Sequence, residues 1–327
     1  MKIWIDFAVP KDVLFLNVFV KEFRESGHEV ILSTRKYLET NDIIDYLGLK
    51  DVYMAGSHGT NREDKLLCYI KRLSKLYPWV LKNKPDILVS FSCAEANRIA
   101  FGLGIPIANF TDMPESDKVM RLTLPMSNVV FTPFIVSRED IWKYWDGPLY
   151  QYNALDPVAW MPETPKPLED ILPTKINRPF IIYRSGETKA SYYEGDDISK
   201  PIVEKLKQLY PEGTFYEVPR YGKHDMVDMQ SLLAHADLFI SGGATMSIEA
   251  AWWGTWSIAC RPVVASYDRW MEEKGLQYRP TSIDHGVEMA KGFISSGVKN
   301  PMMGELRKQK FPLKDICKVI DNIIQTS

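Results

Sequence analysis

The sequence predicts an α/β protein with two domains, in which two doubly wound parallel sheets of the Rossmann type face a cleft. Two observations support this prediction. First, strand-like apolar segments alternate with amphipathic helices in two separate series, a pattern typical of βαβ units. Second, Pro162, Pro165 and Pro167 interrupt the chain between the series, where neither a helix nor a central strand can continue. The length of 327 residues also fits about two domains.

In the first series, apolar residues recur at strand or helix spacing, and Gly or Pro marks the breaks. Lys2–Ile5 is a short apolar run that ends in Asp6, and the following helix stops at Ser26-Gly27-His28. Strands separated by helices at this pitch indicate parallel pairing with right-handed crossovers. The expected elements are the strand Lys2–Ile5, helix Val13–Glu25, strand Glu29–Leu32, helix Asp42–Leu47, strand Val52–Met54, helix Glu63–Lys82, strand Ile87–Val89, helix Ala94–Gly102, strand Ile105–Ala108, helix Glu115–Leu124 and strand Val129–Thr132.

The second series repeats this alternation after the proline-rich segment. We therefore assign residues 1–155 to an N-terminal Rossmann-like domain, 156–178 to a linker and 179–327 to a C-terminal Rossmann-like domain. The expected elements are the strand Phe180–Tyr183, helix Pro201–Tyr210, strand Phe215–Val218, helix Val227–His235, strand Leu238–Ser241, helix Thr245–Trp253, strand Ser257–Ala259 and a closing helix Leu313–Ile324.

Composition excludes several classes of protein. The formal charge of -2 gives no basic face for nucleic acid. Cys68, Cys93, Cys260 and Cys317 lie too far apart for a zinc motif or a disulfide framework, so we expect reduced, buried thiols. No apolar run approaches the ~20 residues of a membrane span, and the N-terminus reads directly into a strand. We expect a cytoplasmic protein without a metal or other cofactor.

The segment from Ala236 to Gly254 holds the strongest functional signal. It predicts a strand, a glycine turn and a helix, and the free N–H groups at such a helix start suit a phosphate or diphosphate. Glu249 follows about one turn into the helix, where its carboxylate can accept hydrogen bonds from ribose hydroxyls. The alternative is a tight structural turn with a surface Glu. The nucleotide-sugar-binding candidates here are Gly242, Gly243, Ala244, Thr245, Met246 and Glu249.

This segment resembles the donor-site motif of GT-B glycosyltransferases and UDP-GlcNAc 2-epimerases. In that motif a Glu stands five residues before a Gly and holds the ribose of UDP, and Glu249 and Gly254 match the spacing. The motif usually ends Gly-x-Pro, whereas this sequence has Gly254-Thr255-Trp256. The resemblance implies a nucleotide-sugar donor site in the C-terminal domain and an acceptor site in the N-terminal domain.

The whole chain also resembles an archaeal family of uncharacterised GT-B-like proteins, a domain of unknown function. The resemblance extends over nearly the full length and implies a GT-B-like fold. The positions that carry it include Lys2-Ile3-Trp4-Ile5-Asp6, Gly27-His28-Glu29-Val30, His58-Gly59, Lys84-Pro85-Asp86, Glu95-Ala96, Asp112, Arg184, Ala190-Ser191-Tyr192-Tyr193 and Pro219-Arg220.

Inverting transfer on this fold needs a base near the acceptor hydroxyl and no bound metal, and the sequence has no convincing Asp-x-Asp motif. The base should follow an N-terminal strand. Related proteins usually carry His in the first such loop, where this sequence has Asp12 and Leu14. The other candidates, each with a bland alternative, are His58 (a solvated bystander), Glu95 (a partner of the helix dipole) and Asp112 (a helix cap).

Positive charge at the departing diphosphate should come from the second domain. Arg184 and Ser185 follow its first strand and Arg220 its second, although either Arg could instead form a surface ion pair. The helix Glu63–Lys82 places apolar residues along one side, with basic residues near by. This stripe indicates either peripheral contact with the inner face of the cell membrane or ordinary packing on the sheet.

Three functions remain open from the sequence. The first is a metal-independent glycosyltransferase that moves a sugar, GlcNAc among the candidates, from a nucleoside diphosphate donor such as UDP to an acceptor hydroxyl, including a lipid-linked one. The second is an enzyme like UDP-GlcNAc 2-epimerase, which needs acid and base groups but no acceptor site. The third is a non-catalytic nucleotide-sugar-binding or partner protein that has lost the acceptor-side His.

Overall fold

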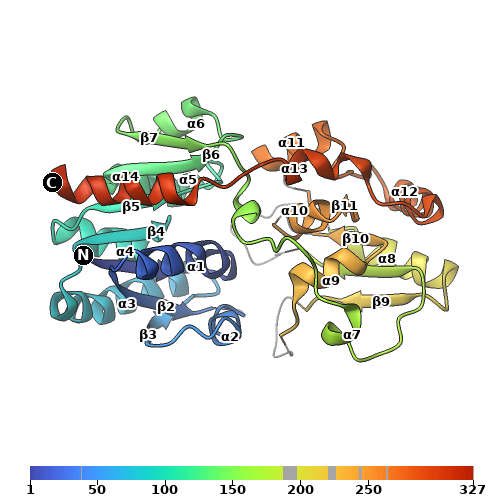
Figure 1. Ribbon diagram of the computed structural model, residues 1–327, viewed down its shortest axis with the longest axis horizontal. Helices are drawn as coiled ribbons and strands as arrows, with labels where there is room; N and C mark the ends of the chain where they lie inside the picture. The colour runs from blue at the N-terminus through green and yellow to red at the C-terminus, as the bar shows by residue number, and fades with distance from the viewer. Residues whose placement is uncertain (38, 187–196, 220–225, 243–244, 263, 327) are drawn as a thin grey trace. The chain divides into compact units, whose positions relative to one another are not determined.

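The structure, a computed structural model, describes residues 1–326 apart from 38, 187–196, 220–225, 243–244 and 263. Contacts divide the chain into two compact units, one of Met1–Trp160 with Lys310–Ser327 and one of Met161–Gln309. Each unit has its own parallel sheet with flanking helices (Figure 1). The predicted α/β class with two doubly wound parallel sheets is therefore confirmed.

The first unit contains a seven-stranded sheet in the order β3-β2-β1-β4-β5-β6-β7, and every pairing between its strands is parallel. The strand order reverses at β1, which lies between β2 and β4. In such sheets ligands bind beyond the carboxyl ends of the strands at this reversal. The strands are β1 (Lys2–Phe7), β2 (Glu29–Lys36), β3 (Val52–Ser57), β4 (Ile87–Phe91), β5 (Ile107–Phe110), β6 (Val129–Pro133) and β7 (Leu149–Tyr152).

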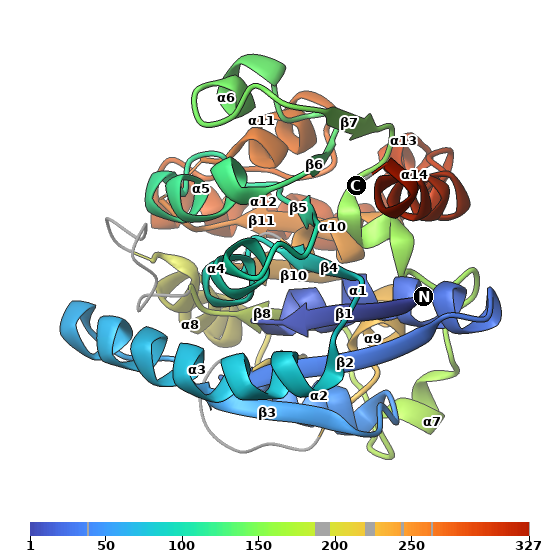
Figure 2. The same ribbon diagram turned by 90° about the vertical axis from the view of Figure 1, so that its left-hand side faces the viewer.

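Helices cover both faces of this sheet. On one face α3, α4 and α5 follow one another (Figure 2), and Leu76 and Val80 of α3 pack with Trp4 and Ala96 in a buried apolar cluster. On the other face α1 packs against α14. The helices of the unit are α1 (Pro10–Glu25), α2 (Thr40–Tyr46), α3 (Arg62–Asn83), α4 (Ala94–Gly102), α5 (Asp117–Thr123), α6 (Arg138–Trp142) and α14 (Leu313–Thr326), with short 3-10 turns at Leu124–Met126 and Asp156–Ala159.

The closing helix belongs to the first unit, which corrects the predicted C-terminal domain of residues 179–327. Phe311 lies 5.5 Å from Phe15 and 5.9 Å from Phe19 between ring centres, and Ile316 and Ile320 are fully buried. This apolar side of α14 has its complement on α1. The predicted linker 156–178 is also divided, because Leu168 and its neighbours pack into a core of the second unit.

The second unit contains a four-stranded parallel sheet in the order β11-β10-β8-β9. Its order reverses between β8 and β10, so the carboxyl ends of these two strands mark its ligand-binding edge. The strands are β8 (Phe180–Arg184), β9 (Thr214–Glu217), β10 (Leu238–Ser241) and β11 (Trp256–Ala259). The helices are α7 (Leu168–Ile171), α8 (Ser199–Leu209), α9 (Met229–His235), α10 (Thr245–Trp252), α11 (Ser266–Glu273), α12 (Ile283–Ser296) and α13 (Gly304–Arg307), with a 3-10 turn at Pro301–Met303.

Candidate functional site

The glycine turn after β10 lies at the reversal point of the second sheet. Gly242 donates its backbone N–H to the carbonyl of Arg184, the last residue of β8, at 2.8 Å. A Cβ atom built on Gly242 would lie 2.2 Å from the backbone nitrogen of Gly186 and 2.4 Å from its Cα. Two backbone turns therefore touch here, and only glycine fits between them.

The predicted donor residues Arg184, Ser185, Thr245 and Met246 lie around this turn, at the end of β8 and the start of α10. Arg184 reaches across, with Nη1 3.5 Å from Sδ of Met246. Gly243, Ala244, Arg220 and residues 190–193 lie outside the described residues.

Glu249 is buried within α10, with 2 % of its surface exposed. Its Oε1 accepts a hydrogen bond from Nε2 of Gln230, on α9, at 3.0 Å. The alternative of a surface Glu is therefore wrong. A buried carboxylate is costly unless polar groups hold it, and Gln230 holds this one at a defined place about one turn into α10.

Sequence reasoning missed a buried charge cluster two residues beyond β11. Arg261 forms an ion pair with Asp268, whose Oδ2 also accepts the backbone N–H of Ala265 at 2.7 Å. Arg279 approaches the other oxygen of Asp268 at 3.4 Å. The Cys260 N–H donates to the carbonyl of Ser241 at 2.7 Å, which holds the start of this segment beside the end of β10. No element had been expected between β11 and the closing helix, so the burial of these charges could not be anticipated.

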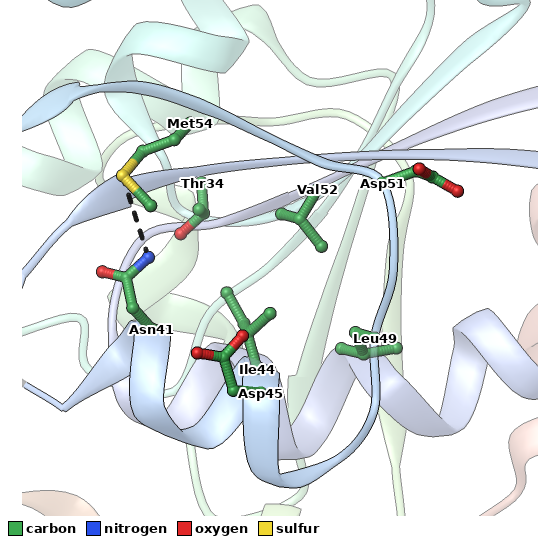
Figure 3. Close-up of a pocket in the computed structure, with 8 residues that line it drawn as sticks. All are labelled: Thr34, Asn41, Ile44, Asp45, Leu49, Asp51, Val52 and Met54. Carbon is green, nitrogen blue, oxygen red and sulfur yellow. Dashed lines mark hydrogen bonds between the residues drawn. The ribbon is translucent and has the colours of Figure 1, made fainter.

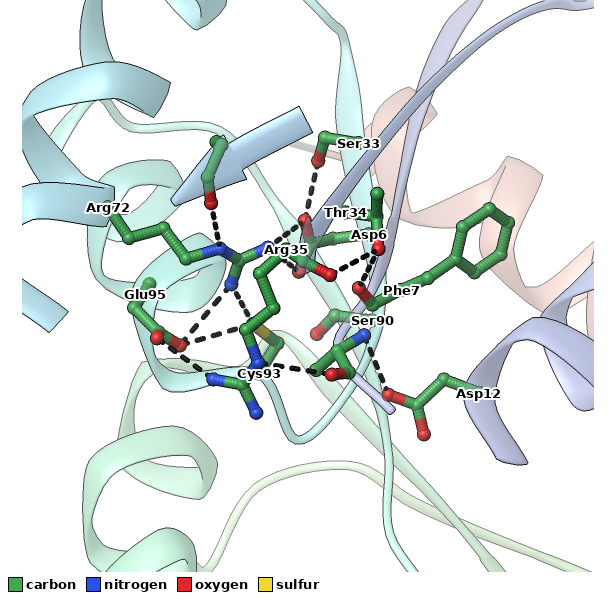
Figure 4. A network of polar contacts seen from close by, with 12 residues as sticks. Asp6, Phe7, Asp12, Ser33, Thr34, Arg35, Arg72, Ser90, Cys93 and Glu95 are labelled. Atoms are coloured by element: carbon green, nitrogen blue, oxygen red, sulfur yellow. Dashed lines mark hydrogen bonds and ion pairs between the residues drawn. The ribbon is translucent and has the colours of Figure 1, made fainter. Parts of the chain in front are cut away.

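In the first unit Asp12 is the third residue of α1 and lies just beyond β1 (Figure 4). Its Oδ2 accepts the backbone N–H groups of Ala8 at 2.9 Å and Val9 at 3.1 Å. Burial raises the pKa of Asp12 to about 7, although these hydrogen bonds and the charge of Lys11 act in the opposite direction. Both backbone bonds use Oδ2, which leaves Oδ1 to take up a proton.

Glu95, near the start of α4, is held by two arginines (Figure 4). Arg35 Nη1 lies 3.1 Å from its Oε1 and Arg72 Nη1 lies 3.3 Å from its Oε2. Burial alone would raise the pKa of Glu95, but Arg35 and Arg72 outweigh it and hold the pKa at about 2. A carboxylate with so low a pKa is a poor proton acceptor at neutral pH, so this geometry favours a positioning role over a base.

The same network ends in a fully buried ion pair that sequence reasoning did not identify. Arg72 Nη2 lies 2.7 Å from Oδ1 and 3.0 Å from Oδ2 of Asp6, and both side chains are 0 % exposed. A sequence signal existed, because Arg72 precedes Leu76 and Val80 at four-residue spacing on the buried side of α3. A cation on an apolar helix face requires a buried acid, and Asp6 lies near the carboxyl end of β1.

His58 follows β3 and is not a solvated bystander. Its ring stacks on Tyr37 with ring centres 4.3 Å apart, and its Nδ1 lies 2.6 Å from the Gly59 carbonyl oxygen. Burial and the charge of Arg35 lower the pKa of His58 to about 4. The imidazole is therefore neutral at neutral pH. Arg35 therefore influences both Glu95, through an ion pair, and His58, through its charge. Its Nε also donates a hydrogen bond to the carbonyl oxygen of Ala8 at 3.0 Å.

Asp112 lies beyond β5 and forms an ion pair with Lys11. Lys11 Nζ also contacts Asp156 at 2.6 Å, and Asp156 accepts the Tyr152 hydroxyl at 2.5 Å. Burial disfavours the lysine charge, but the two carboxylates outweigh it and raise the pKa of Lys11. Ser116, not Asp112, occupies the cap position of α5, so the capping alternative is wrong.

The carboxyl edge of the first sheet thus brings together Asp12, His58, Glu95 and Asp112 with Lys11, Arg35 and Arg72. A pocket of about 260 Å³ lies between β2, α2 and β3 (Figure 3). Its lining runs from Asp51 and Val52 at the amino end of β3 to Thr34, whose hydroxyl donates to the Phe7 carbonyl at the carboxyl end of β1. Within the described ranges, no three His, Cys, Asp or Glu residues gather closely enough to hold a metal ion.

A family model described as "Protein of unknown function (DUF354)" matches residues 1–323. An uncharacterised protein of Methanocaldococcus jannaschii, MJ0665, is 25% identical over 298 residues, which cover 84% of this chain and 86% of that protein.

Solved structures of similar fold span the whole chain at low identity. UDP-GlcNAc 2-epimerase from Neisseria meningitidis, bound to UDP-GlcNAc, is 13% identical with a TM-score of 0.68 and full coverage of both chains (100% and 100%). The spinosyn forosaminyltransferase SpnP is 14% identical with a TM-score of 0.67 and 99% coverage of each chain. MurG of Acinetobacter baumannii is 14% identical with a TM-score of 0.56, covering 100% of this chain and 99% of its own. Similarity at this level shows a shared fold, and it confirms the predicted GT-B-like architecture.

Proposed function

This chain belongs to the DUF354 family of proteins of unknown function, and from that premise we propose that it is a metal-independent glycosyltransferase that uses a nucleotide sugar. The proposed reaction moves a sugar from a nucleoside diphosphate, UDP in the first instance, to an acceptor hydroxyl. The observation that carries the proposal is the close approach of Gly242 and Gly186, followed about one turn into α10 by the buried, hydrogen-bonded Glu249.

We assign the donor to the carboxyl edge of the second sheet. The backbones of Gly242 and Gly186 approach each other just before the start of α10. The N–H groups and the dipole of a helix start favour a diphosphate. The Arg184 guanidinium can stabilise the charge that develops on the leaving diphosphate, and we assign the same role to Arg220. Glu249 is assigned to the ribose hydroxyls. The Neisseria structure of the same fold holds UDP-GlcNAc, which makes that compound the first donor to test.

We assign the base to Asp12 in the first unit. A base works best with a pKa near the operating pH, and the pKa of about 7 at Asp12 meets this condition, whereas Glu95 at about 2 and His58 at about 4 lie below it. In the proposed step Asp12 accepts the acceptor's hydroxyl proton. The oxygen then forms the new bond to the anomeric carbon, and the bond from that carbon to the diphosphate oxygen breaks.

A second candidate is a 2-epimerase, because the TM-score of 0.68 to the Neisseria enzyme is about the same as the 0.67 to the forosaminyltransferase. An epimerase needs no acceptor, so the products of incubation with UDP-GlcNAc alone distinguish the two. The epimerase produces UDP-ManNAc, whereas the transferase produces at most a slow release of UDP. A non-catalytic binding protein produces neither and still binds UDP.

The experiment that tests the donor site is calorimetric titration with UDP, UDP-GlcNAc, GDP and ADP, beside a Glu249→Ala control. Saturable binding of one nucleotide that the substitution weakens is the expected result. If no nucleotide binds to folded protein, the glycine turn is only structural and the transferase proposal is wrong.

We also include a lipid-linked acceptor at the inner face of the cell membrane in the proposal.

A further inference from the structure

Helix α3 exposes a row of large apolar side chains. Leu66 is 62 % exposed, Ile70 52 %, Tyr77 51 % and Leu81 45 %. Their spacing of four, seven and four residues places them along one side of the helix. The sheet-facing side is different, because Arg72, Leu76 and Val80 are buried there. The stripe predicted from the sequence did not separate this exposed side of the helix from the side that packs on the sheet.

The two helices that follow α3 in the same layer also expose large apolar side chains. Phe101 at the end of α4 is 55 % exposed, and Leu122 on α5 is 52 % exposed. Helix α4 contacts both α3 and α5 (Figure 2). Scattered exposed apolar residues are ordinary, but large ones repeated on three adjacent helices indicate a contact surface.

A row of lysines runs beside the apolar row. Lys71, Lys75 and Lys82 are all exposed, and their spacing of four and seven residues places them on one side of α3. After Asp64 the helix contains no Asp or Glu, and none of the three lysines is in an ion pair with a carboxylate in the described part of the chain. Apart from Asp64 in the first turn, whose carboxylate interacts electrostatically with Lys71, α3 therefore offers this row no counter-charge.

We propose that the α3 face, defined by Leu66, Ile70, Tyr77, Leu81, Lys71, Lys75, Lys82, Phe101 and Leu122, docks on the surface of an anionic lipid bilayer. An apolar row beside a lysine row is the arrangement of helices that lie in the membrane interface, where apolar groups enter the acyl boundary and lysines meet anionic headgroups. No described helix is long and apolar enough to cross a bilayer, so the contact is peripheral.

A second copy of the chain is a poorer occupant of this face. In a two-fold contact the same patch meets itself. The unpaired lysines of both copies would then be buried near one another, and α3 offers no carboxylate to pair with them beyond its first turn. Anionic headgroups supply the missing charge. This inference deepens the proposed function. It rests on the proposed function only where it links the membrane contact to a lipid-linked acceptor.

The test is co-sedimentation of the full chain with phosphatidylcholine vesicles with and without phosphatidylglycerol, at low and high salt. We expect binding only with phosphatidylglycerol and weaker binding at high salt. The triple variant Lys71→Gln/Lys75→Gln/Lys82→Gln should reduce the binding by on the order of 100-fold. This fold-change follows because each lysine near an anionic surface contributes about 1 kcal/mol to the binding free energy. Leu66→Gln/Ile70→Gln should reduce it by on the order of tenfold.

Two control variants in the second unit match these changes. Leu209 and Val298 are 52 % and 62 % exposed, so Leu209→Gln/Val298→Gln copies the apolar change, and Lys175→Gln/Lys200→Gln/Lys274→Gln copies the charge change. Both should bind vesicles like the unchanged protein. Equal binding by all variants, or no binding to either vesicle, overturns the inference. A dimer that only the α3 variants disrupt, without vesicle binding, would assign the face to a protein contact instead.

Nucleotide titration of the same variants separates this inference from the proposed function. Loss of vesicle binding with unchanged UDP affinity supports the α3 face. Vesicle binding by a protein that binds no nucleotide leaves the α3 face standing and removes the transferase proposal.

Discussion

Gln230 of α9 donates a hydrogen bond to the buried carboxylate of Glu249 on α10, across 3.0 Å. The bond links two helices that flank β10, and it fixes one oxygen of a side chain that the sequence motif assigns to the ribose. The arrangement therefore predicts that donor binding depends on Gln230 as well as on Glu249.

Glu249→Ala should weaken UDP binding by roughly 1–3 kcal/mol, because the ribose hydroxyls would lose a hydrogen-bond acceptor in a desolvated place. Gln230→Ala should weaken it by less, since it frees the carboxylate without removing it. Calorimetry measures both affinities, and urea unfolding of each variant controls for lost stability. Unchanged UDP affinity in folded Glu249→Ala would show that the ribose assignment is wrong.

Gly242→Ala tests the contact between the two turns. The added Cβ would lie 2.2 Å from the Gly186 nitrogen, which is backbone and cannot swing away. We expect a loss of about 1–3 kcal/mol in the free energy of unfolding, together with loss of UDP binding. Gly292→Ala is the matched control, because Gly292 lies inside α12 with nothing within 4 Å of the added atom. It should stabilise the protein by up to about 1 kcal/mol. A neutral Gly242→Ala would contradict the close approach.

The sequence predicted both sheets, apart from the edge strand β7, and the glycine turn, because their signals are local. The apolar run Leu238–Ser241, the glycines and the helix after them are contiguous, so periodicity and turn chemistry suffice. Arg261 and Asp268 could not be found in this way, because one lies in the segment after β11 and the other on α11, and only the folded chain brings the two charges together. The placement of α14 failed for a related reason. An amphipathic helix specifies that one side is covered, and only packing against Phe15 and Phe19 decides by which unit.

The pH dependence of turnover distinguishes the candidate bases. If Asp12 is the base, kcat/KM should rise with pH through about 7 and then level off, because the carboxylate must be ionised. Asp12→Asn should abolish this rise and most turnover while leaving UDP affinity unchanged. A rise near 4 would indicate His58 instead, whose pKa lies there.

The titration of Asp12 should also affect the stability of the protein, which should fall as the pH rises. The folded pKa of Asp12 lies above its ordinary value of 3.8, so its contribution is fully present below about pH 4 and is lost as pH rises through about 7. Urea unfolding at pH 5 and pH 8 should therefore show a smaller loss for Asp12→Asn than for the unchanged protein.

The Asp6–Arg72 pair should dominate the stability of the first unit's polar network. Arg72→Met leaves a carboxylate buried without its cation, and we expect a loss of about 3–5 kcal/mol in the free energy of unfolding. The exposed Lys143–Asp140 pair is the control, since Lys143→Met removes a solvent-screened ion pair and should change the free energy of unfolding far less. Asp6→Asn/Arg72→Met should recover part of the loss. Equal effects of Arg72→Met and Lys143→Met would mean that water reaches the buried pair.

Lys11 contacts two carboxylates that should respond differently to substitution. Asp156 is 3 % exposed and also accepts the Tyr152 hydroxyl, whereas the Asp112 side chain is 21 % exposed. Asp112 is therefore the more exposed carboxylate of this pair. Asp112→Asn should lower turnover with little change in UDP affinity and a modest change in stability, because Asp156 still neutralises Lys11. Asp156→Asn should cost several times more stability, since a buried network loses its central acceptor. Turnover with UDP-GlcNAc and a verified acceptor, measured beside urea unfolding, checks both. Normal turnover in Asp112→Asn would restrict this cluster to holding the sheet edge together.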